Sequence, residues 1–385
     1  MSKHILLGIC GSIAAYKSPD IVRGLVKKGF RVTCILTRSA QKFVSKFALE
    51  NVSEEICYTD DDFWNENNLH IKLARQVDFL LLAPATINSL SKLSSNLADN
   101  LLLNCCVSFK KNIICAPSMH TEMYEKAYVD NVFKTLKKKG VKFLGPISGE
   151  LLSGDVGLGR MLEPKSIADS VEFLSHGTLN LTNKKILVVS GGTKENIDPV
   201  RQITNASSGI MGQALAATAA ANNANVSLLS TTTCDNFGYK KLLTVPTYKE
   251  LKQAVLDECR HVDYVIMAAA ISDYIPKYND KKIKRSQDNL MLELFPTEDI
   301  LRLITQTYPN KTTIGFCLQD DINDHSIPIK KVKDKSCDFI ISNTTNNLGN
   351  YIKTYSLFQK QQFKKKLENI SVAKAAYEIM SLITN

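Results

Sequence analysis

Short hydrophobic runs alternate along this chain with stretches in which apolar residues recur every three or four positions. In the first half, runs with the length of buried strands lie at residues 5–10, 32–36, 79–82, 113–115 and 141–144. Apolar residues at helical spacing follow in 21–26, and Gly29 suits the end of that helix. This alternation predicts a parallel sheet covered by helices on both faces.

The same pattern starts again in the second half. Further strand-like runs lie at residues 186–190, 226–229, 264–268, 313–317 and 339–342. A helix rich in small residues is expected at 208–221, and the polar segment 176–184 breaks the periodicity. A length of 385 residues also suits two domains. We therefore predict an α/β protein of two three-layer α/β/α domains, spanning residues 1–178 and 179–385.

The net charge and the cysteine content of the chain indicate which kinds of ligand and which compartment to expect. The net charge of +10 favours anionic ligands, without choosing between nucleotides, nucleic acid and acidic membranes. Ten cysteines without a C-x-x-C pair indicate reduced thiols in the cytoplasm. The charge-free run at 5–16 resembles the core of a signal peptide, but a strand entering a glycine turn explains it better. We expect no targeting segment and no membrane partner.

Both predicted domains begin with a strand, a turn of small residues and a helix. In open α/β sheets, ligands bind at the carboxyl ends of strands, and helix N-termini attract phosphate. Neither turn matches the common dinucleotide or P-loop patterns. Two such starts predict two phosphate-bearing ligands.

Two strings in the first half suit a flat phosphorylated ring. Gly11 permits close backbone approach and Ser12 offers a hydroxyl, while residues 83–88 and 98–102 follow later strands. These strings resemble the flavin mononucleotide (FMN) site of the flavodoxin-like cysteine decarboxylases, although Asn96 stands where glycine is usual. The resemblance implies a flavodoxin-like domain whose FMN contacts are Gly11, Ser12, Ile13, Thr37, Ala83, Pro84, Thr86 and Asn88.

The resemblance also assigns catalytic residues in this half. His70 matches the family's histidine, the base near the substrate thiol. His120 stands where the family has an asparagine that holds the substrate. Ser153 replaces the cysteine that donates a proton, and a hydroxyl is a far weaker acid than a thiol. We therefore expect a slow last step, with His120 as an alternative acid.

Residues 191–212 form the densest motif of the chain. They resemble the signature of phosphopantothenate–cysteine ligases at almost every fixed position. Their polar loop enters the N-terminus of a helix, which suits an anion. The resemblance implies a Rossmann-like ligase domain in which Arg201, Asn205 and Lys284 are catalytic.

Downstream strings resemble the nucleotide site of the same family. They imply CTP as the substrate, an acyl-cytidylate intermediate, and cations that offset phosphate charge. Asp273 could hold the nucleotide or its Mg²⁺, and the metal ligands stay open. The nucleotide-binding residues are Asp273, Lys284, Thr297, Glu298, Asp299, Ile300, Phe316, Lys331 and Lys335.

The resemblance covers the whole chain and points to the bifunctional enzymes of coenzyme A biosynthesis. It implies 4′-phosphopantothenate, cysteine and CTP as substrates, and a homo-oligomer with a trimeric flavin half and a dimeric ligase half. Two alternatives stay open. The first is a ligase-only enzyme with a degenerate flavin half, suggested by Ser153 and His120. The second is a basic RNA-binding α/β protein, which has the charge but no aromatic-rich recognition motif; we expect no nucleic-acid partner.

Overall fold

Two compact units make up the chain in a computed structural model that describes residues 2–284, 289–345 and 352–384. The first comprises Met1–Glu172 with Asn236–Gly238, and the second Phe173–Asp235 with Tyr239–Asn385. Residues 176–184, where the sequence predicts the linker, lie outside helices and strands. The exact boundary at 178/179 stays a prediction. Among the described residues, no helix is both long and apolar enough to cross a bilayer.

The first unit contains a parallel sheet with the order β3-β2-β1-β4-β5-β6. The strands are β1 (His4–Ile9), β2 (Arg31–Leu36), β3 (Cys57–Thr59), β4 (Phe79–Ala85), β5 (Ile113–Pro117) and β6 (Lys142–Phe143), and an antiparallel hairpin, β7 (Ile147–Glu150) and β8 (Val156–Arg160), follows them. Every strand predicted in this half is confirmed. The short β3 and the hairpin were not predicted.

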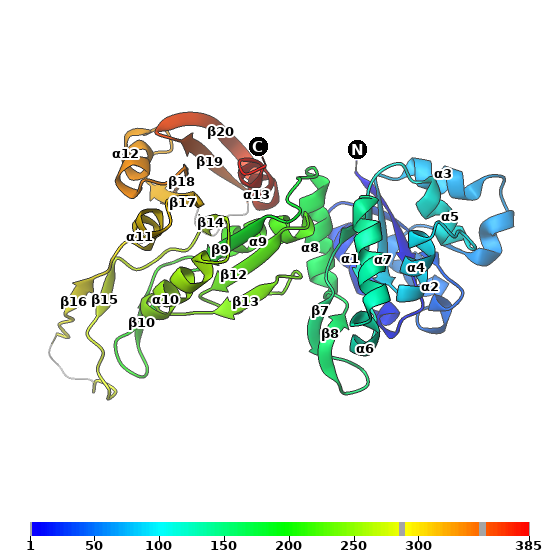
Figure 1. Cartoon of the computed structure of the whole chain (residues 1–385), viewed down its shortest axis with the longest axis horizontal. Coiled ribbons are helices and arrows are strands. Elements are labelled where there is room, and N and C mark those ends of the chain that lie inside the picture. The colour runs from blue at the N-terminus through cyan, green and yellow to red at the C-terminus, as the bar shows by residue number, and fades with distance from the viewer. Residues whose placement is uncertain (1, 285–288, 346–351, 385) are drawn as a thin grey trace. The chain divides into compact units, whose positions relative to one another are not determined.

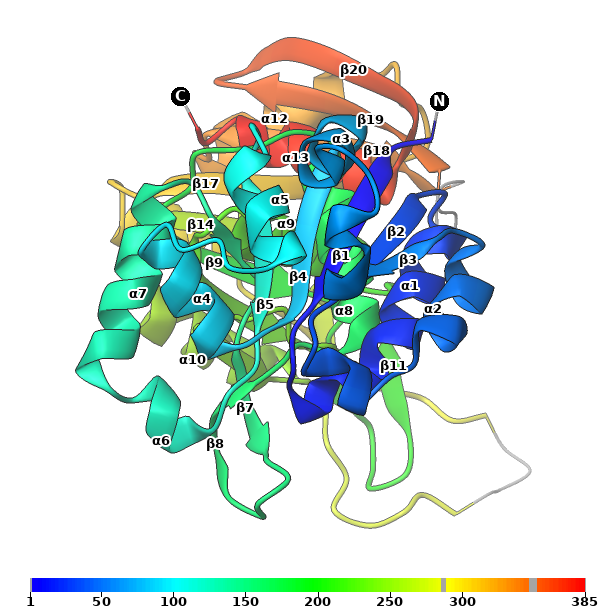
Figure 2. The same ribbon diagram turned by 90° about the vertical axis from the view of Figure 1, so that its right-hand side faces the viewer.

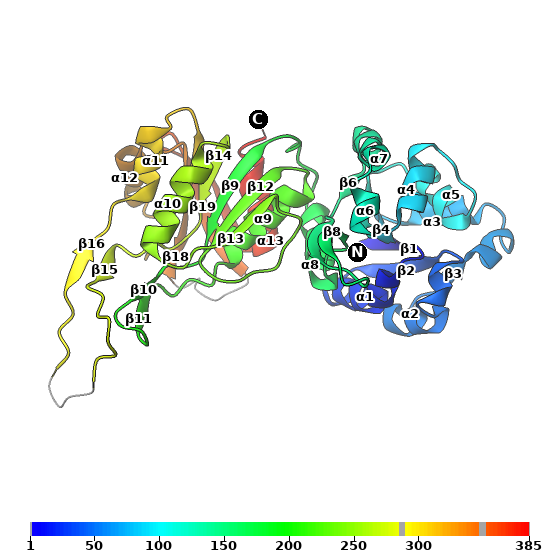
Figure 3. The same cartoon turned by 60° about the horizontal axis from the view of Figure 1, so that its bottom comes forward.

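Helices cover both faces of this sheet, as Figure 3 shows. On one side lie α1 (Ser18–Lys27), α2 (Lys46–Ser53) and α8 (Pro164–Ser175), and on the other α3 (Leu69–Gln76), α4 (Ile87–Ser94), α5 (Leu101–Ser108) and α7 (Ala127–Lys138), with the short α6 (Thr121–Tyr124). The core joins Leu6 and Leu82 of the sheet to Leu102 of α5 and Phe133 of α7. Gly29 has φ +82° just beyond α1, as the sequence predicts.

The second unit contains a mixed sheet with the order β13-β12-β9-β14-β17-β18-β19-β20 (Figures 1 and 2). Its strands are β9 (Lys185–Ser190), β12 (Asn225–Ser230), β13 (Lys241–Thr244), β14 (Tyr264–Met267), β17 (Thr312–Gln319), β18 (Phe339–Thr344), β19 (Ile352–Gln359) and β20 (Gln362–Ser371). The strands from β13 to β18 are parallel, whereas β19 and β20 pair antiparallel. The sequence predicts the parallel centre of this sheet but not its antiparallel edge.

Helices lie on both faces of this sheet as well. One face carries α9 (Ile210–Ala221) and α13 (Val372–Ser381), and the other α10 (Tyr248–Cys259), α11 (Ile300–Thr307) and α12 (Ser326–Lys335). Two small hairpins extend from the ends of strands: β10 (Lys194–Asn196) with β11 (Gln202–Thr204), and β15 (Tyr274–Pro276) with β16 (Leu294–Pro296). The predicted α/β fold of two three-layer domains is confirmed.

Candidate functional site

The first candidate site lies where the strand order of the first unit reverses direction. β1 pairs with β2 on one side and with β4 on the other, so the loops that follow β1 and β4 diverge. Such a reversal opens a crevice at the carboxyl ends of the strands. Ser12 follows β1 and Ser118 follows β5, and their hydroxyl oxygens lie 2.8 Å apart. The Ser118 N–H donates to Ala85 O of β4 over 3.0 Å.

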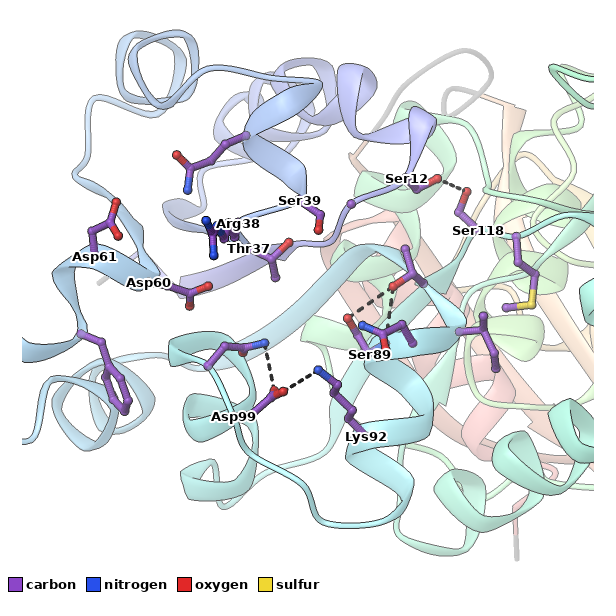
Figure 4. A pocket seen from close by; sticks show the side chains of 18 of the residues that line it. Ser12, Thr37, Arg38, Ser39, Asp60, Asp61, Ser89, Lys92, Asp99 and Ser118 are labelled. Atoms are coloured by element: carbon purple, nitrogen blue, oxygen red, sulfur yellow. Dashed lines mark hydrogen bonds and ion pairs between the residues drawn. The ribbon is translucent and has the colours of Figure 1, made fainter.

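A cavity of about 1190 Å³ opens at this point, as Figure 4 shows. Of the predicted flavin contacts, it gathers Gly11, Ser12, Thr37, Thr86 and Asn88. Ile87, Asp99 and Asn100, from the two strings that resemble the flavin site, line it as well. Further lining comes from residues outside these strings: Arg38, Ser39, Gln41, Asp60, Asp61, Phe63, Trp64, Ser89, Lys92, Ser118, Met119 and Met123. Most of these residues follow the carboxyl ends of strands, which is the signal that could have found them.

Three predicted flavin contacts do not line the cavity. Ala83 and Pro84 are buried within β4, where Pro84 O accepts the Cys10 N–H at 3.1 Å. Ile13 lies 45% exposed in the 3-10 helix Ile13–Lys17. Gly11 has a steric reason to be glycine, since a Cβ there would lie 2.3 Å from Ser39 Cβ.

The residues around this cavity fit FMN. Hydroxyl groups from Ser12, Ser118 and Thr86 converge on the crevice, and the guanidinium of Arg38 adds a cation, so a phosphate ester finds donors there. Phe63 and Trp64 offer apolar surface to a flat ring. The volume exceeds the roughly 300–1,000 Å³ of typical ligand pockets.

His70 is the second residue of α3 and stands beside this cavity. Its ring meets Phe63 edge-on, with centroids 5.6 Å apart, and Phe63 lines the cavity. His70 itself is half-buried and does not line it. Its predicted role as a base stays a prediction.

Two of the residues that depart from the family pattern, His120 and Ser153, lie in contact with each other. His120 Nε2 is 3.1 Å from Ser153 Oγ and 3.0 Å from Asp155 Oδ2. Ser153 Oγ donates to the same carboxylate oxygen over 2.8 Å. The hydrogen bond from Ser153, and then that from His120, lower the pKa of the Asp155 carboxyl. The motifs predict no contact between His120 and Ser153 and no role for Asp155.

The second candidate site also lies at a reversal of strand order. β9 pairs with both β12 and β14, and the predicted ligase signature starts directly after β9. Backbone hydrogen bonds tie this signature to the loop after β14: Ala270 N–H donates to Gly191 O over 2.7 Å, and Thr193 N–H donates to Ala270 O over 3.2 Å. The two loops together form the carboxyl edge at which a ligand of this fold binds.

Asp198 organises the signature loop. Its carboxylate is 1% exposed and accepts hydrogen bonds from the N–H groups of Val200 and Arg201, both at 2.8 Å, and of Ile283, at 3.1 Å. Arg201 Nη1 also donates to Asp198 Oδ2 and, at 3.0 Å, to Ile283 O. Burial raises the pKa of Asp198, but these hydrogen bonds outweigh it and bring the pKa to about 2.

This arrangement joins the signature to the segment 279–284, which contains Lys284. Ile283 is held through both its N–H and its carbonyl, and Asn279 N–H donates to Ile197 O over 2.9 Å. Lys284 follows Ile283 directly and is exposed. The predicted catalytic residues Arg201 and Lys284 are thereby brought together, with Arg201 bound to protein groups. The neighbouring Arg285 lies outside the described residues.

Asn205 and Thr193 connect the signature with Asp273. Asn205 Nδ2 donates to Ala270 O over 3.1 Å, so one donor of this predicted catalytic amide is bound to the protein. The buried Thr193 Oγ1 accepts the Ser272 N–H at 3.0 Å. Thr297 N–H donates to Asp273 O over 2.9 Å, and Thr297 Oγ1 donates to Ser272 O over 2.8 Å. The Asp273 carboxylate is exposed and has no partner among the described residues.

The other predicted nucleotide contacts occupy α11, α12 and β17. Lys335 Nζ lies 2.8 Å from Asp299 Oδ2, at the start of α11. Glu298 pairs with Lys252 at 2.6 Å. Lys331 is half-buried one turn before Lys335 in α12, Phe316 is half-buried in β17, and Ile300 is buried in the core. The structure thus groups Asp273 with Thr297, Glu298, Asp299 and Lys335, whereas Ile300 contributes packing.

Comparison with known proteins covers both units. Residues 1–175 match the model of the family described as Flavoprotein, and residues 181–385 match that of the DNA/pantothenate metabolism flavoprotein C-terminal domain. The coenzyme A biosynthesis bifunctional protein CoaBC of Borreliella burgdorferi is 33% identical, and the alignment covers 98% of this chain and 99% of that protein. The chain belongs to the CoaBC family. It is therefore a bifunctional enzyme of coenzyme A biosynthesis, with a flavoprotein domain that acts as the decarboxylase and a ligase domain.

Solved structures of the CoaBC family and its relatives resemble each half separately. The C-terminal domain of a coenzyme A biosynthesis bifunctional protein CoaBC is 31% identical, covers 54% of this chain and 97% of its own, and has a TM-score of 0.46. A cysteine-to-serine mutant of PPC decarboxylase, complexed with pantothenoylaminoethenethiol, is 30% identical, covers 46% of this chain and 100% of its own, and has a TM-score of 0.43. Membership of the CoaBC family disfavours the RNA-binding alternative.

Proposed function

We propose that this CoaBC-family chain carries out two consecutive steps toward coenzyme A. The C-terminal domain joins cysteine to 4′-phosphopantothenate at the expense of CTP, through an acyl-cytidylate. The N-terminal domain, with FMN, then decarboxylates 4′-phosphopantothenoylcysteine to 4′-phosphopantetheine. The observation that supports this best is the full-length match to a bifunctional relative, together with a candidate site at the strand reversal of each domain.

In the N-terminal domain, the residues of the cavity would hold FMN. Ser12, Ser118 and Thr86 offer hydroxyl groups, Arg38 offers a cation, and Gly11 lets the backbone approach closely. When bound, FMN accepts and later returns two electrons. His70 would take up a proton from the substrate thiol. Asp60 Oδ1 accepts the Leu101 N–H at 3.1 Å and so fixes the start of α5 at the cavity rim.

In the C-terminal domain, the lysines would offset the charge of the transferred phosphorus. Lys284 is exposed beside the signature loop, and Lys331 lies half-buried in α12. Asp273 presents an exposed carboxylate that has no partner within the described part of the chain. Mg²⁺ usually binds through one or two carboxylates plus substrate phosphates, so we infer that it arrives with the triphosphate and contacts Asp273. Asn205 keeps its carbonyl oxygen and one N–H for the acyl phosphate, while Arg201 holds the loop.

We further propose that these reactions take place in the cytoplasm and in a homo-oligomer, with trimeric contacts through the flavin domain and dimeric contacts through the ligase domain. All ten cysteines are free thiols, which suits a reducing compartment. Size measurement by light scattering, on the full chain, tests the assembly. A monomer at working concentrations would contradict it.

The ligase proposal is tested by pyrophosphate release. The purified chain should release pyrophosphate from CTP only when 4′-phosphopantothenate is present, and it should form the cysteine amide on addition of cysteine. ATP and GTP are the controls for nucleotide choice. Release that is independent of 4′-phosphopantothenate would contradict the proposed substrate.

Ser153 and His120 replace the expected cysteine and asparagine, which suggested a ligase with an inactive flavin domain, but membership of the CoaBC family does not favour this alternative. The cavity supports flavin binding in either case. The two candidates differ in one product. Release of carbon dioxide from 4′-phosphopantothenoylcysteine supports the bifunctional enzyme, and its absence supports the ligase alone.

A further inference from the structure

A hydrogen-bonded cluster of His120, Ser153 and Asp155 lies beside residues that line the flavin cavity, although none of the three lines it. His120 precedes α6, and the other two residues belong to the turn between β7 and β8. Met119 and Met123, on either side of His120, both line the cavity. The Met119 N–H donates to Gly159 O of β8 over 3.0 Å, which holds the hairpin against this segment. The cluster is therefore built from two segments fixed to each other at the cavity rim.

The hydrogen bonds define which nitrogen of His120 carries the proton. Nδ1 accepts the Glu122 N–H at 3.3 Å, so the proton of the neutral ring lies on Nε2. Nε2 faces Asp155 Oδ2 and Ser153 Oγ. The titratable groups near the ring are Asp155 at Nε2 and Glu122, whose Oε2 lies 4.0 Å from Nδ1. Both are carboxylic acids, and as carboxylates they offset the charge of an imidazolium.

We propose that His120 delivers the proton in the last step of the decarboxylase reaction, and that Asp155 positions its ring. This inference rests on the function proposed above. The last step saturates the carbon–carbon double bond of the enethiol, which requires one hydride and one proton. FMN held in the cavity would supply the hydride, and the protein supplies the proton. In the imidazolium both ring nitrogens carry a proton, so Nδ1 gives up the 3.3 Å hydrogen bond from the Glu122 N–H. The N–H bond at Nε2 then breaks, a C–H bond forms, the ring is left neutral with its proton on Nδ1, and solvent reprotonates Nε2.

Ser153 is poorly suited to the same task. Its hydroxyl proton points to Asp155 Oδ2, and an alcohol without a strong base donates a proton only reluctantly near neutral pH. Histidine is the side chain that exchanges a proton in this range. The role of Ser153 in the cluster is to accept or donate one hydrogen bond and so keep Asp155 in place. Position 153 carries a hydroxyl where the family has the more acidic thiol of a cysteine. His120, which contacts Ser153, has an imidazole that can donate a proton.

The test is a single turnover of 4′-phosphopantothenoylcysteine by the flavin-loaded full chain, with enethiol and 4′-phosphopantetheine followed by mass. Replacing His120→Asn should slow the conversion of enethiol to product by about a hundredfold or more, since general acids contribute that much. Asp155→Asn should slow it by a smaller factor. Ser153→Ala should slow it less than Asp155→Asn does, because Ser153 acts only by holding the Asp155 carboxylate. Glu150→Gln, an exposed carboxylate on the same hairpin without a partner among the described residues, is the matched control.

Two further measurements separate proton donation from a structural effect. Free imidazole in the buffer should restore the last step in His120→Ala, because imidazole can donate the missing proton. It would not restore a step that was lost through a structural defect. In the flavin-free protein, long-range ¹H–¹⁵N spectra should show His120 in the Nε2-protonated tautomer, and a mixture of tautomers in Asp155→Asn. The His120→Asn spectrum identifies the signal among the six histidines. A tautomer mixture in the wild type would overturn the positioning role of Asp155.

The outcomes distinguish this inference from the proposed function. If the wild type releases carbon dioxide and His120→Asn makes product as fast, only the inference is wrong. If Ser153→Ala traps the enethiol while His120→Asn does not, the proton comes from Ser153. If the wild type forms neither carbon dioxide nor enethiol, the decarboxylase function is wrong and the inference falls with it.

Discussion

We expect the substitution of threonine by valine to have opposite effects on stability at two buried positions of the ligase domain. Thr193 is completely buried, and its Oγ1 accepts the Ser272 N–H at 3.0 Å. Thr218 in α9 is also completely buried, but its Oγ1 has no hydrogen-bond partner among the described residues. Valine has a methyl group of similar size in place of the threonine hydroxyl, so neither replacement leaves a cavity.

The expected energies follow from what each hydroxyl does. Thr193→Val leaves a buried N–H unpaired, which costs about 1–3 kcal/mol. That corresponds to an increase of about 5- to 150-fold in the unfolding equilibrium constant. Thr218→Val removes an unpaired polar atom and should be neutral or stabilising. Thr193→Val should also raise the KM for CTP, because Ser272 fixes the backbone next to Asp273.

Amide hydrogen exchange followed by mass spectrometry measures both variants in the full chain. Exchange of the most protected amides in β9 and β14 should accelerate in Thr193→Val and stay equal or slow down in Thr218→Val. Amides of β1 and β4, in the other domain, are the internal control. Equal destabilisation by both variants would refute the reasoning that links the Thr193 hydroxyl to Ser272.

Three more predictions concern the two sites and their pH dependence. Lys284→Gln should strongly slow pyrophosphate release, because a neutral amide does not offset phosphate charge; an initial rate equal to the wild type would remove Lys284 from the mechanism. Gly11→Ala places a Cβ 2.3 Å from Ser39 Cβ, so the purified protein should lose its flavin absorbance while pyrophosphate release persists. Burial raises the pKa of Asp299, but the ion pair with Lys335 outweighs it and the pKa is lowered. The stability from this pair is therefore present above the usual aspartate pKa of about 3.9 and is lost as the pH falls through the lowered value. Urea unfolding of Lys335→Met should show a deficit at neutral pH that disappears in acid.

Much of the fold follows from the pattern of hydrophobic residues. The parallel strands read as short continuous apolar runs, because both faces of each sheet are buried. Strands with one exposed face do not form continuous apolar runs, so the sequence pattern did not predict them. β19 and β20 are missing from the prediction since the lysines at 364–366 break the apolar pattern of β20. The hairpin of β7 and β8 is glycine-rich and mostly exposed, so it reads as a loop.

The candidate sites were predictable only in part. Motifs placed Ser12, Thr86 and Asp273 at strand ends and Lys284 in a loop, where the structure has them. A motif does not report which side chains bind each other. The contact of His120 with Ser153 joins residues 33 apart, and that of Asp198 with Ile283 joins residues 85 apart. Both contacts depend on tertiary structure, so they had no signal in the sequence.

The most direct test of the central claim is one reaction mixture. The purified chain is incubated with 4′-phosphopantothenate, cysteine, CTP and Mg²⁺, and all products are followed by mass over time. The account predicts that 4′-phosphopantothenoylcysteine rises first and is then converted to 4′-phosphopantetheine, with carbon dioxide released in equal amount. Accumulation of 4′-phosphopantothenoylcysteine without carbon dioxide, in protein that contains flavin, would contradict the claim that one chain performs both steps.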